Sequence, residues 1–68
     1  MAKMTLKAAR VNSGLTQKEA AKAFGVSNKT VGDWEKGRSF PKADKIKLIC
    51  EVYKCIYDDI IFLPADSL

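Results

Sequence analysis

Residues 15–37, which read LTQKEAAKAFGVSNKTVGDWEKG, contain two short helix patterns separated by three residues. Thr16 and Glu19 have the spacing of a capping box. In that motif the threonine hydroxyl accepts a hydrogen bond from the amide of the glutamate, whose carboxylate accepts one from the amide of the threonine. These residues therefore predict a helix over about residues 16–24.

The segment that follows predicts a sharp turn into a second helix. Gly25 stands at the helix end, where a left-handed backbone is needed, and glycine adopts that conformation without a steric penalty. Ser27 is a good N-cap for a helix over residues 28–36, and Gly37 would end it. Two short helices joined by about three residues have the geometry of a helix-turn-helix.

The rest of the chain adds further short helix patterns and no strand alternation or repeat. Helices are expected at about residues 5–11, 43–53 and 57–62. In residues 43–53 the apolar side chains recur at helical spacing, and the two acidic residues that begin 57–62 suit the first turn of a helix. We therefore predict an all-α, compact five-helix fold, with residues 1–68 as a single domain.

The helix expected at residues 28–36 separates polar from apolar side chains when drawn at about 100° per residue. Val31 and Trp34 fall on the apolar side, so Trp34 is expected in the core. On the polar side, an amide can pair with adenine and an ammonium with guanine. The residues of this helix expected to contact bases are Asn28, Lys29, Thr30, Gly32 and Asp33.

Two of these residues have particular consequences. Gly32 lacks a side chain where the helix would approach base edges. Asp33 can accept from cytosine N4, or it can repel phosphate and narrow the choice of sites. Gln17, beside the turn, can touch a phosphate and brace a neighbouring side chain. A solvated helix face without function could also carry such residues.

The net charge of +4 is distributed unevenly along the chain. Residues 1–47 hold eleven Lys or Arg and four Asp or Glu, giving +7, whereas residues 48–68 hold one and four, giving −3. A basic front indicates a polyanionic partner on one side. The residues expected to contact DNA phosphates are Thr16, Lys18, Lys22, Ser27, Lys36, Arg38 and Lys42.

Several classes of function and location are disfavoured. There is no His, no nucleophile beside a base, no phosphate-binding glycine loop and no metal constellation, so we expect no enzyme, no cofactor and no metal. No apolar run could span a bilayer, and the start of the chain does not resemble a signal peptide. We therefore expect a cytoplasmic protein without a membrane partner, in which Cys50 and Cys55 stay reduced as small apolar residues.

The pattern of residues 15–41 resembles a known family. Leu15-Thr16-Gln17, Ala21 and Gly25-Val26-Ser27, followed by Thr30-Val31, Trp34-Glu35, Gly37-Arg38 and Pro41, resemble the Cro/C1-type (XRE) helix-turn-helix family of phage repressors and bacterial regulators. The resemblance continues through Ile46, Ile49, Cys50, Tyr53 and Asp59-Ile60, and so covers most of the chain.

The resemblance implies a dimer that binds a partly palindromic DNA operator in the major groove, with half-sites about one helical turn apart. It implies base contacts by Gln17, Asn28, Lys29 and Asp33. It also implies a pair between Arg10 and Glu35, which we interpret as structural. The expected function is therefore that of a small transcriptional regulator, a Cro-like repressor, with no small-molecule effector evident.

Three positions depart from the family pattern. Ala20 replaces a usual leucine, which predicts a thinner core filled by Phe24 and Trp34. Lys54 replaces a usual glycine, so a left-handed cap there would be strained or absent. Ile56 replaces a usual polar N-cap, which puts the geometry of the C-terminal third in doubt.

The C-terminal segment is unusually apolar, with Tyr57 and Ile60-Ile61-Phe62-Leu63 close together. If Ile60 and Leu63 face the core of a short helix, Tyr57 and Ile61 are left exposed. We therefore predict a homodimer interface at Phe40, Tyr57 and Ile61. The alternative is that the whole cluster packs within a monomer. A further alternative for function is an antitoxin or protein-interaction module of the same fold that binds a partner protein.

Overall fold

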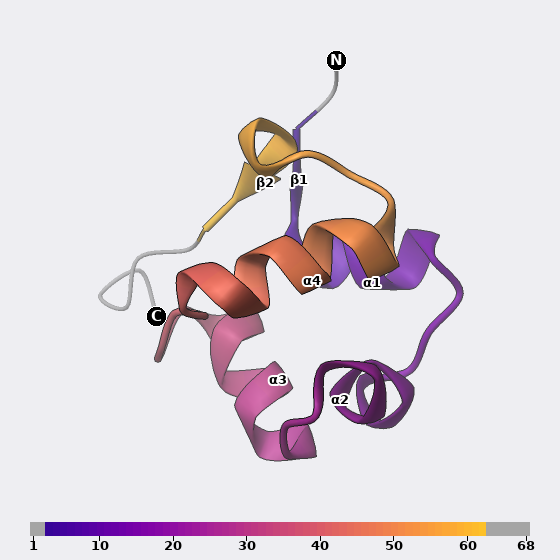
Figure 1. Cartoon of the computed structure of the whole chain (residues 1–68), viewed down its shortest axis with the longest axis vertical. Coiled ribbons are helices and arrows are strands. Elements are labelled where there is room, and N and C mark those ends of the chain that lie inside the picture. Colours follow the sequence, from indigo (N-terminus) through magenta and orange to yellow (C-terminus); the bar gives the residue numbers. More distant parts are fainter. Residues whose placement is uncertain (1–2, 63–68) are drawn as a thin grey trace.

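The computed structural model describes residues 3–62 of the chain and is mostly helical (Figure 1). Four α-helices follow one another, two in the centre of the chain and one on either side. Their bounds are α1 at Leu6–Asn12, α2 at Gln17–Phe24, α3 at Asn28–Lys36 and α4 at Ala43–Tyr53. A short strand, β1 at Met4–Thr5, precedes them, and a 3₁₀ turn, η1 at Tyr57–Asp59, leads into a second strand, β2 at Ile60–Ile61.

Helix α3 has the predicted bounds, and α2 begins one residue later than predicted, at Gln17. The Thr16 hydroxyl accepts from the amide of Glu19 at 3.1 Å, and the Glu19 carboxylate accepts from the amide of Thr16 at 2.9 Å, so the capping box is confirmed. Gly25 has a left-handed backbone at the end of α2, and Ser27 caps α3 by accepting from the amide of Thr30. The local signals were therefore sufficient for this unit.

The prediction of a fifth helix over residues 57–62 is wrong, and residues 3–62 contain four α-helices instead of five. Only Tyr57–Asp59 turn, as a single 3₁₀ turn, and Ile60 is already extended. Ile56 at the N-cap position makes no side-chain hydrogen bond to the turn. Without that cap a short helix has too little stability to form. Pairing with β1 provides hydrogen-bond partners for the backbone of Ile60–Ile61 instead.

The strand pair is the second departure from the sequence-based prediction, which contained no strand. β1 and β2 are parallel, with Met4 opposite Ile60 and Thr5 opposite Ile61. Each strand has two residues, so neither carries a readable alternation pattern. The pair brings the two ends of the described chain together beside α1 (Figure 1). Leu63, predicted to face the core, lies outside the described residues.

The core lies between the four helices and is closed by Ile60 from β2. Trp34 is 7% exposed, as expected of a core residue, and its ring lies 6.2 Å from that of Phe24. Phe24 also meets Tyr53 edge-on, with ring centres 5.3 Å apart. Ala20 is fully buried in the same core cluster as these aromatic side chains.

Candidate nucleic-acid interface

The helix-turn-helix unit is held together by its own backbone at the turn. The amide of Val26 donates to the carbonyl of Ala21 at 3.0 Å, across the left-handed Gly25. The ammonium of Lys45, from α4, donates to the carbonyl of Phe24 at 2.9 Å. That last contact joins residues 21 positions apart, and no local sequence signal predicts it.

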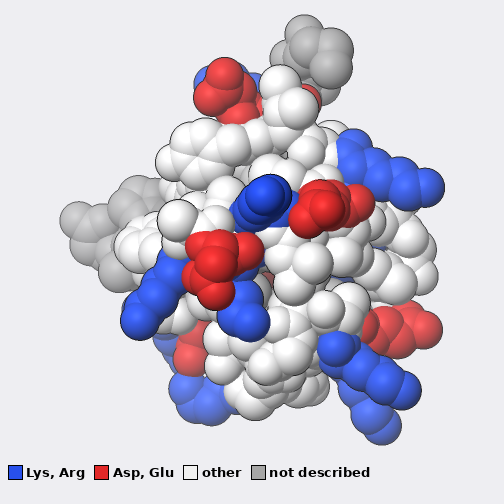
Figure 2. Space-filling model, viewed as in Figure 1, with Lys and Arg blue, Asp and Glu red and all other residues white. Residues whose placement is uncertain are grey.

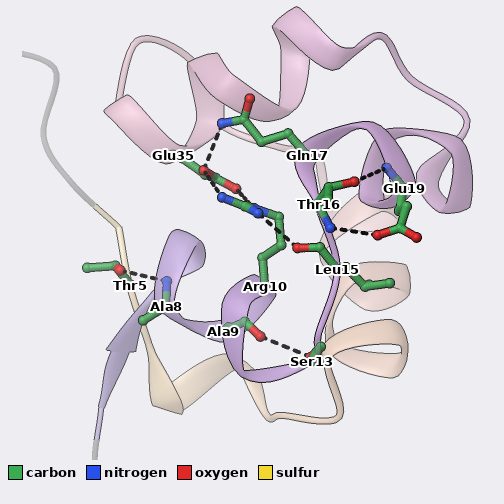
Figure 3. Close-up of polar contacts among 10 residues, drawn as sticks. All are labelled: Thr5, Ala8, Ala9, Arg10, Ser13, Leu15, Thr16, Gln17, Glu19 and Glu35. Carbon is green, nitrogen blue, oxygen red and sulfur yellow. Dashed lines mark hydrogen bonds and ion pairs between the residues drawn. The ribbon is translucent and has the colours of Figure 1, made fainter.

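A buried ion pair fixes α3 against α1 (Figure 3). The guanidinium of Arg10 contacts both carboxylate oxygens of Glu35, at 2.7 and 3.3 Å, and the two side chains are only 10% and 5% exposed. The third arm of Arg10 donates to the carbonyl of Leu15 at 2.9 Å. The hydrogen bond to Glu35 raises the pKa of Arg10. Arg10 therefore joins α1, the start of the α1–α2 connection and α3.

Gln17 extends this network to the first turn of α2 (Figure 3). Its side-chain NH₂ donates to the Glu35 carboxylate at 3.0 Å, and within residues 3–62 its carbonyl oxygen makes no hydrogen bond. A methyl group built on Gly32 would lie 3.7 Å from the Gln17 side chain, which is ordinary contact. Gln17 therefore sits between the buried ion pair and the middle of α3, braced as the sequence led us to expect.

The exposed side of α3 carries its own ion pair. The ammonium of Lys29 lies 2.7 Å from the carboxylate of Asp33, one helical turn away. The hydrogen bond from Lys29 lowers the pKa of Asp33, and the charges of Arg38 and Lys36 lower it further. Asp33 is therefore ionised at neutral pH and partly neutralises the lysine beside it.

The candidate base-contacting residues differ in their exposure to solvent. Asn28 and Lys29 are exposed, whereas the remaining members of the set are half-buried. Those half-buried members are Gln17, Thr30, Gly32 and Asp33. The Thr30 hydroxyl is 2.9 Å from that of Ser27, so the start of α3 is held by paired hydroxyl groups as well as by its backbone.

The candidate phosphate-contacting residues are all exposed and come from both helices and the loops around them. They are Thr16, Lys18, Lys22, Ser27, Lys36, Arg38 and Lys42. Figure 2 shows Lys and Arg side chains projecting around the part of the molecule that contains α2 and α3. The capping-box contacts lower the pKa of Glu19 in this region, where the backbone amide of Thr16 holds its carboxylate.

A family model described as Helix-turn-helix matches residues 6–59. The chain belongs to the helix-turn-helix family. The match spans all four α-helices and supports the Cro/C1-type resemblance read from the sequence. This family consists of DNA-binding regulators, and the matched residues include the whole α2–α3 unit. Comparisons with curated proteins and with solved structures found no match.

Neither a membrane-spanning helix nor a metal site is seen in the described part of this helix-turn-helix chain. No helix among residues 3–62 has both the length and the apolar character needed to cross a membrane. The same residues contain no group of three or more His, Cys, Asp or Glu side chains placed to hold a metal ion.

The residues proposed for self-association lie together at one side of this helix-turn-helix domain. Phe40 and Tyr57 are each 55% exposed and Ile61 is 43% exposed. The rings of Phe40 and Tyr57 both meet Phe62, with ring centres 6.3 and 5.7 Å apart. Phe62 therefore links the loop before α4 to the 3₁₀ turn. The exposed Ile56 also belongs to this segment, and the sequence reasoning did not include it.

Proposed function

We propose that this protein binds double-stranded DNA sequence-specifically by placing α3 in the major groove, and that it acts as a small transcriptional repressor. The observation that carries this proposal is the network of Arg10, Glu35 and Gln17, which ties α1, α2 and α3 into one unit. A reading helix must hold its side chains in fixed register, and buried hydrogen-bonded charges provide that rigidity.

The charge distribution supports the same proposal. Glu35 is buried and paired with Arg10, so it presents no free negative charge to a phosphate. Asp33 is paired with Lys29 and Glu19 with the Thr16 backbone. Around these acids the exposed basic residues remain available to the DNA backbone, where each contact releases a counterion.

Two roles for side chains follow from their positions. Asn28 and Lys29, exposed at the start of α3, read base edges, together with Thr30, Gly32, Asp33 and Gln17. The exposed lysines of α2 and the residues after α3 hold the phosphates and carry no sequence information. In this arrangement Gln17 reaches DNA through its free carbonyl oxygen, because its NH₂ is held by Glu35.

The proposed active form is a homodimer on a partly palindromic operator. Two copies related by a twofold axis would place two α3 helices about one DNA turn apart. The exposed surface of Phe40, Tyr57 and Ile61 is the proposed contact between them. Large exposed apolar side chains gathered in one patch favour such a contact over free solvation.

Selection of bound duplexes from a random DNA pool at near-physiological salt tests the proposal. We expect enrichment of an inverted repeat whose half-site centres lie about ten base pairs apart. The double variant Asn28→Ala/Lys29→Ala should lose the enrichment. Lys54→Ala, which removes one exposed positive charge at the end of α4, serves as the charge-matched control and should retain it.

The outcomes separate the parts of the proposal. A single enriched half-site would retain DNA reading and exclude the dimer on DNA. Binding without enrichment, weakened equally by both variants, would show that only non-specific charge attraction operates.

A second candidate function is binding of a partner protein, as in an antitoxin of this fold. The position of Asp33 on α3 favours it, because a carboxylate on this helix is less suited to approach phosphate than a neutral or basic side chain. Absence of any enriched duplex, together with capture of one defined partner that is lost in Asp33→Ala, would favour this function over DNA reading.

A further inference from the structure

Two cysteines lie at opposite ends of the turn that ends α4. Cys50 is in the last turn of the helix, and Cys55 is the second residue beyond it; both are free thiols and half-buried. Between them Lys54 has a left-handed backbone, with φ 54°. The amides of Lys54 and Cys55 both donate hydrogen bonds to the carbonyl of Cys50, and the bond from Cys55 is 3.0 Å long.

This hydrogen-bond pattern places the two cysteines at defined positions of a helix-ending motif. A bond from the second residue after the helix to the carbonyl five residues earlier is the long bond of a Schellman motif. The side chains at these two positions commonly touch each other in that motif. Cys50 and Cys55 both pack against the same core cluster. The fold therefore brings their side chains to one side of the turn.

The pKa of the Cys55 thiol agrees with this placement of the two side chains. Burial raises the pKa of the Cys55 thiol, and the neighbouring Cys50 thiol raises it further. Such an effect of one thiol on another requires proximity.

Cys55 is also accessible to a small reagent. It lines a hollow of about 390 Å³ between α1 and the end of α4, bordered by Met4, Asn12, Ser13 and Lys54. The volume of this hollow lies within the range of small-molecule pockets, so part of a small disulfide reagent can approach Cys55 there. Cys50 is not among the residues that line the hollow, so Cys55 is the thiol that an incoming reagent meets.

We propose that Cys50 and Cys55 form a reversible intramolecular disulfide, which makes the end of α4 a redox-sensitive site. The oxidant is a small-molecule disulfide such as oxidised glutathione. In the minor fraction of molecules in which Cys55 is a thiolate, its sulfur attacks the reagent to form a mixed disulfide and releases one small thiol. The Cys50 thiolate then attacks the Cys55 sulfur and releases the second. Two protein thiols become one disulfide, the reagent is reduced to two thiols, and the two protons pass to the leaving sulfurs.

The disulfide would restrain the turn between residues 50 and 55, in which Lys54 has the left-handed backbone. Residues after this turn lead through η1 to β2, whose Ile60 closes the core. Oxidation would therefore restrain the connection between α4 and the exposed Tyr57 and Ile61. This proposal is independent of DNA binding, because no residue of α2 or α3 takes part.

Equilibration of the native protein in glutathione buffers of graded ratio tests the proposal. Acid quenching, alkylation and mass measurement count the free thiols. We expect both thiols to disappear together, with loss of two hydrogen atoms and with the Cys50 and Cys55 peptides joined. The same titration in concentrated guanidinium chloride gives the unfolded reference. The oxidation constant should be at least roughly 10-fold larger in the folded chain, because the turn holds the thiols together.

Single variants provide the matched controls. Cys50→Ser leaves the Cys55 thiol and should accumulate a mixed disulfide with glutathione under conditions where the parent shows none. Cys55→Ser leaves only the Cys50 thiol and should form its mixed disulfide more slowly. Stable mixed disulfides in the parent, or disulfides between two chains, would overturn the proposal. An oxidation constant no larger in the folded chain than in guanidinium chloride would overturn it as well.

Discussion

At the scale of single residues, Glu35 is the most connected side chain of the helix-turn-helix unit. Its carboxylate accepts from Arg10 on α1 and from Gln17 on α2. Arg10 in turn reaches the carbonyl of Leu15. Burial removes water from these charges, so each depends on its partner for compensation. The network thus contributes more to the orientation of α3 than any single contact.

Glu35→Gln should lower the free energy of unfolding by about 3 kcal/mol, because Arg10 would remain buried without its counter-charge. Urea denaturation of the variant beside the parent measures this. The double variant Arg10→Met/Glu35→Leu, which removes both charges, should lose less than the single variant does. A single variant as stable as the parent would show that the pair is not coupled to folding.

A methyl group added at Gly32 should affect stability and DNA binding in opposite directions. A Cβ at this position meets only the side chain of Gln17, at ordinary contact distance. Gly32→Ala should therefore raise the free energy of unfolding by about 0.5–1 kcal/mol, as expected for alanine inside a helix. DNA binding should weaken, because the methyl group stands where the helix approaches base edges. Unchanged affinity would remove Gly32 from the interface.

At the scale of elements, the residues at helix ends determine how accurately helix positions can be predicted from the sequence. Thr16, Gly25 and Ser27 carry local signals, so the positions of α2 and α3 could be predicted to within a residue. The segment after Ile56 has no N-cap, and its conformation depends on pairing with β1, more than fifty residues earlier. A pairing of two residues with two residues leaves no pattern, which is why this segment was mistaken for a helix.

The same distinction holds within the candidate site. The polar face of α3 could be read from its periodicity, because spacing alone determines which residues share a face. The contact of Lys45 with Phe24 could not, since it depends on how α4 packs against the end of α2. Lys29 and Asp33 have the i, i+4 spacing of a helical ion pair, so their contact can be predicted from the sequence. The base-contacting role assigned to both residues does not include this contact.

The end of α4 carries strain that one substitution should relieve. Lys54 has a left-handed backbone, which costs a residue with a Cβ about 1 kcal/mol relative to glycine. Lys54→Gly should therefore raise the free energy of unfolding by roughly that amount, as measured by thermal or urea unfolding. Lys54→Ala keeps the Cβ and removes the charge, so it should show no such gain. Equal gains in both variants would attribute the effect to charge.

At the scale of the whole molecule, α2 and α3 lie at one end of the domain, and η1 and β2 lie at the other (Figure 1). The exposed Tyr57 and Ile61 belong to η1 and β2, whereas the exposed Phe40 lies in the loop between α3 and α4. This separation suits a protein that contacts DNA with one face and a second copy with another. A domain of this size buries only a modest core, so association would also add stability.

Ile61→Asp should abolish self-association, because the charge would have to be buried in the proposed interface. Equilibrium sedimentation, with and without the enriched duplex, measures the association state. The parent should place two copies on an inverted repeat, and the variant should not. Val11→Asp, which changes an exposed apolar residue on α1, is the matched control and should behave like the parent. An unchanged association state in Ile61→Asp would exclude this interface.

The central claim, that α3 reads base edges in the major groove, is tested most directly by a binding cycle on the enriched duplex. Replacing one guanine with 7-deazaguanine removes a single major-groove acceptor. We expect this change to cost the parent about 1–3 kcal/mol at one position of each half-site and to cost Lys29→Ala nothing further there. Lys22→Ala should remain sensitive to it while losing about one unit of salt slope. Equal sensitivity of all three proteins, or of none at any guanine, would contradict the claim.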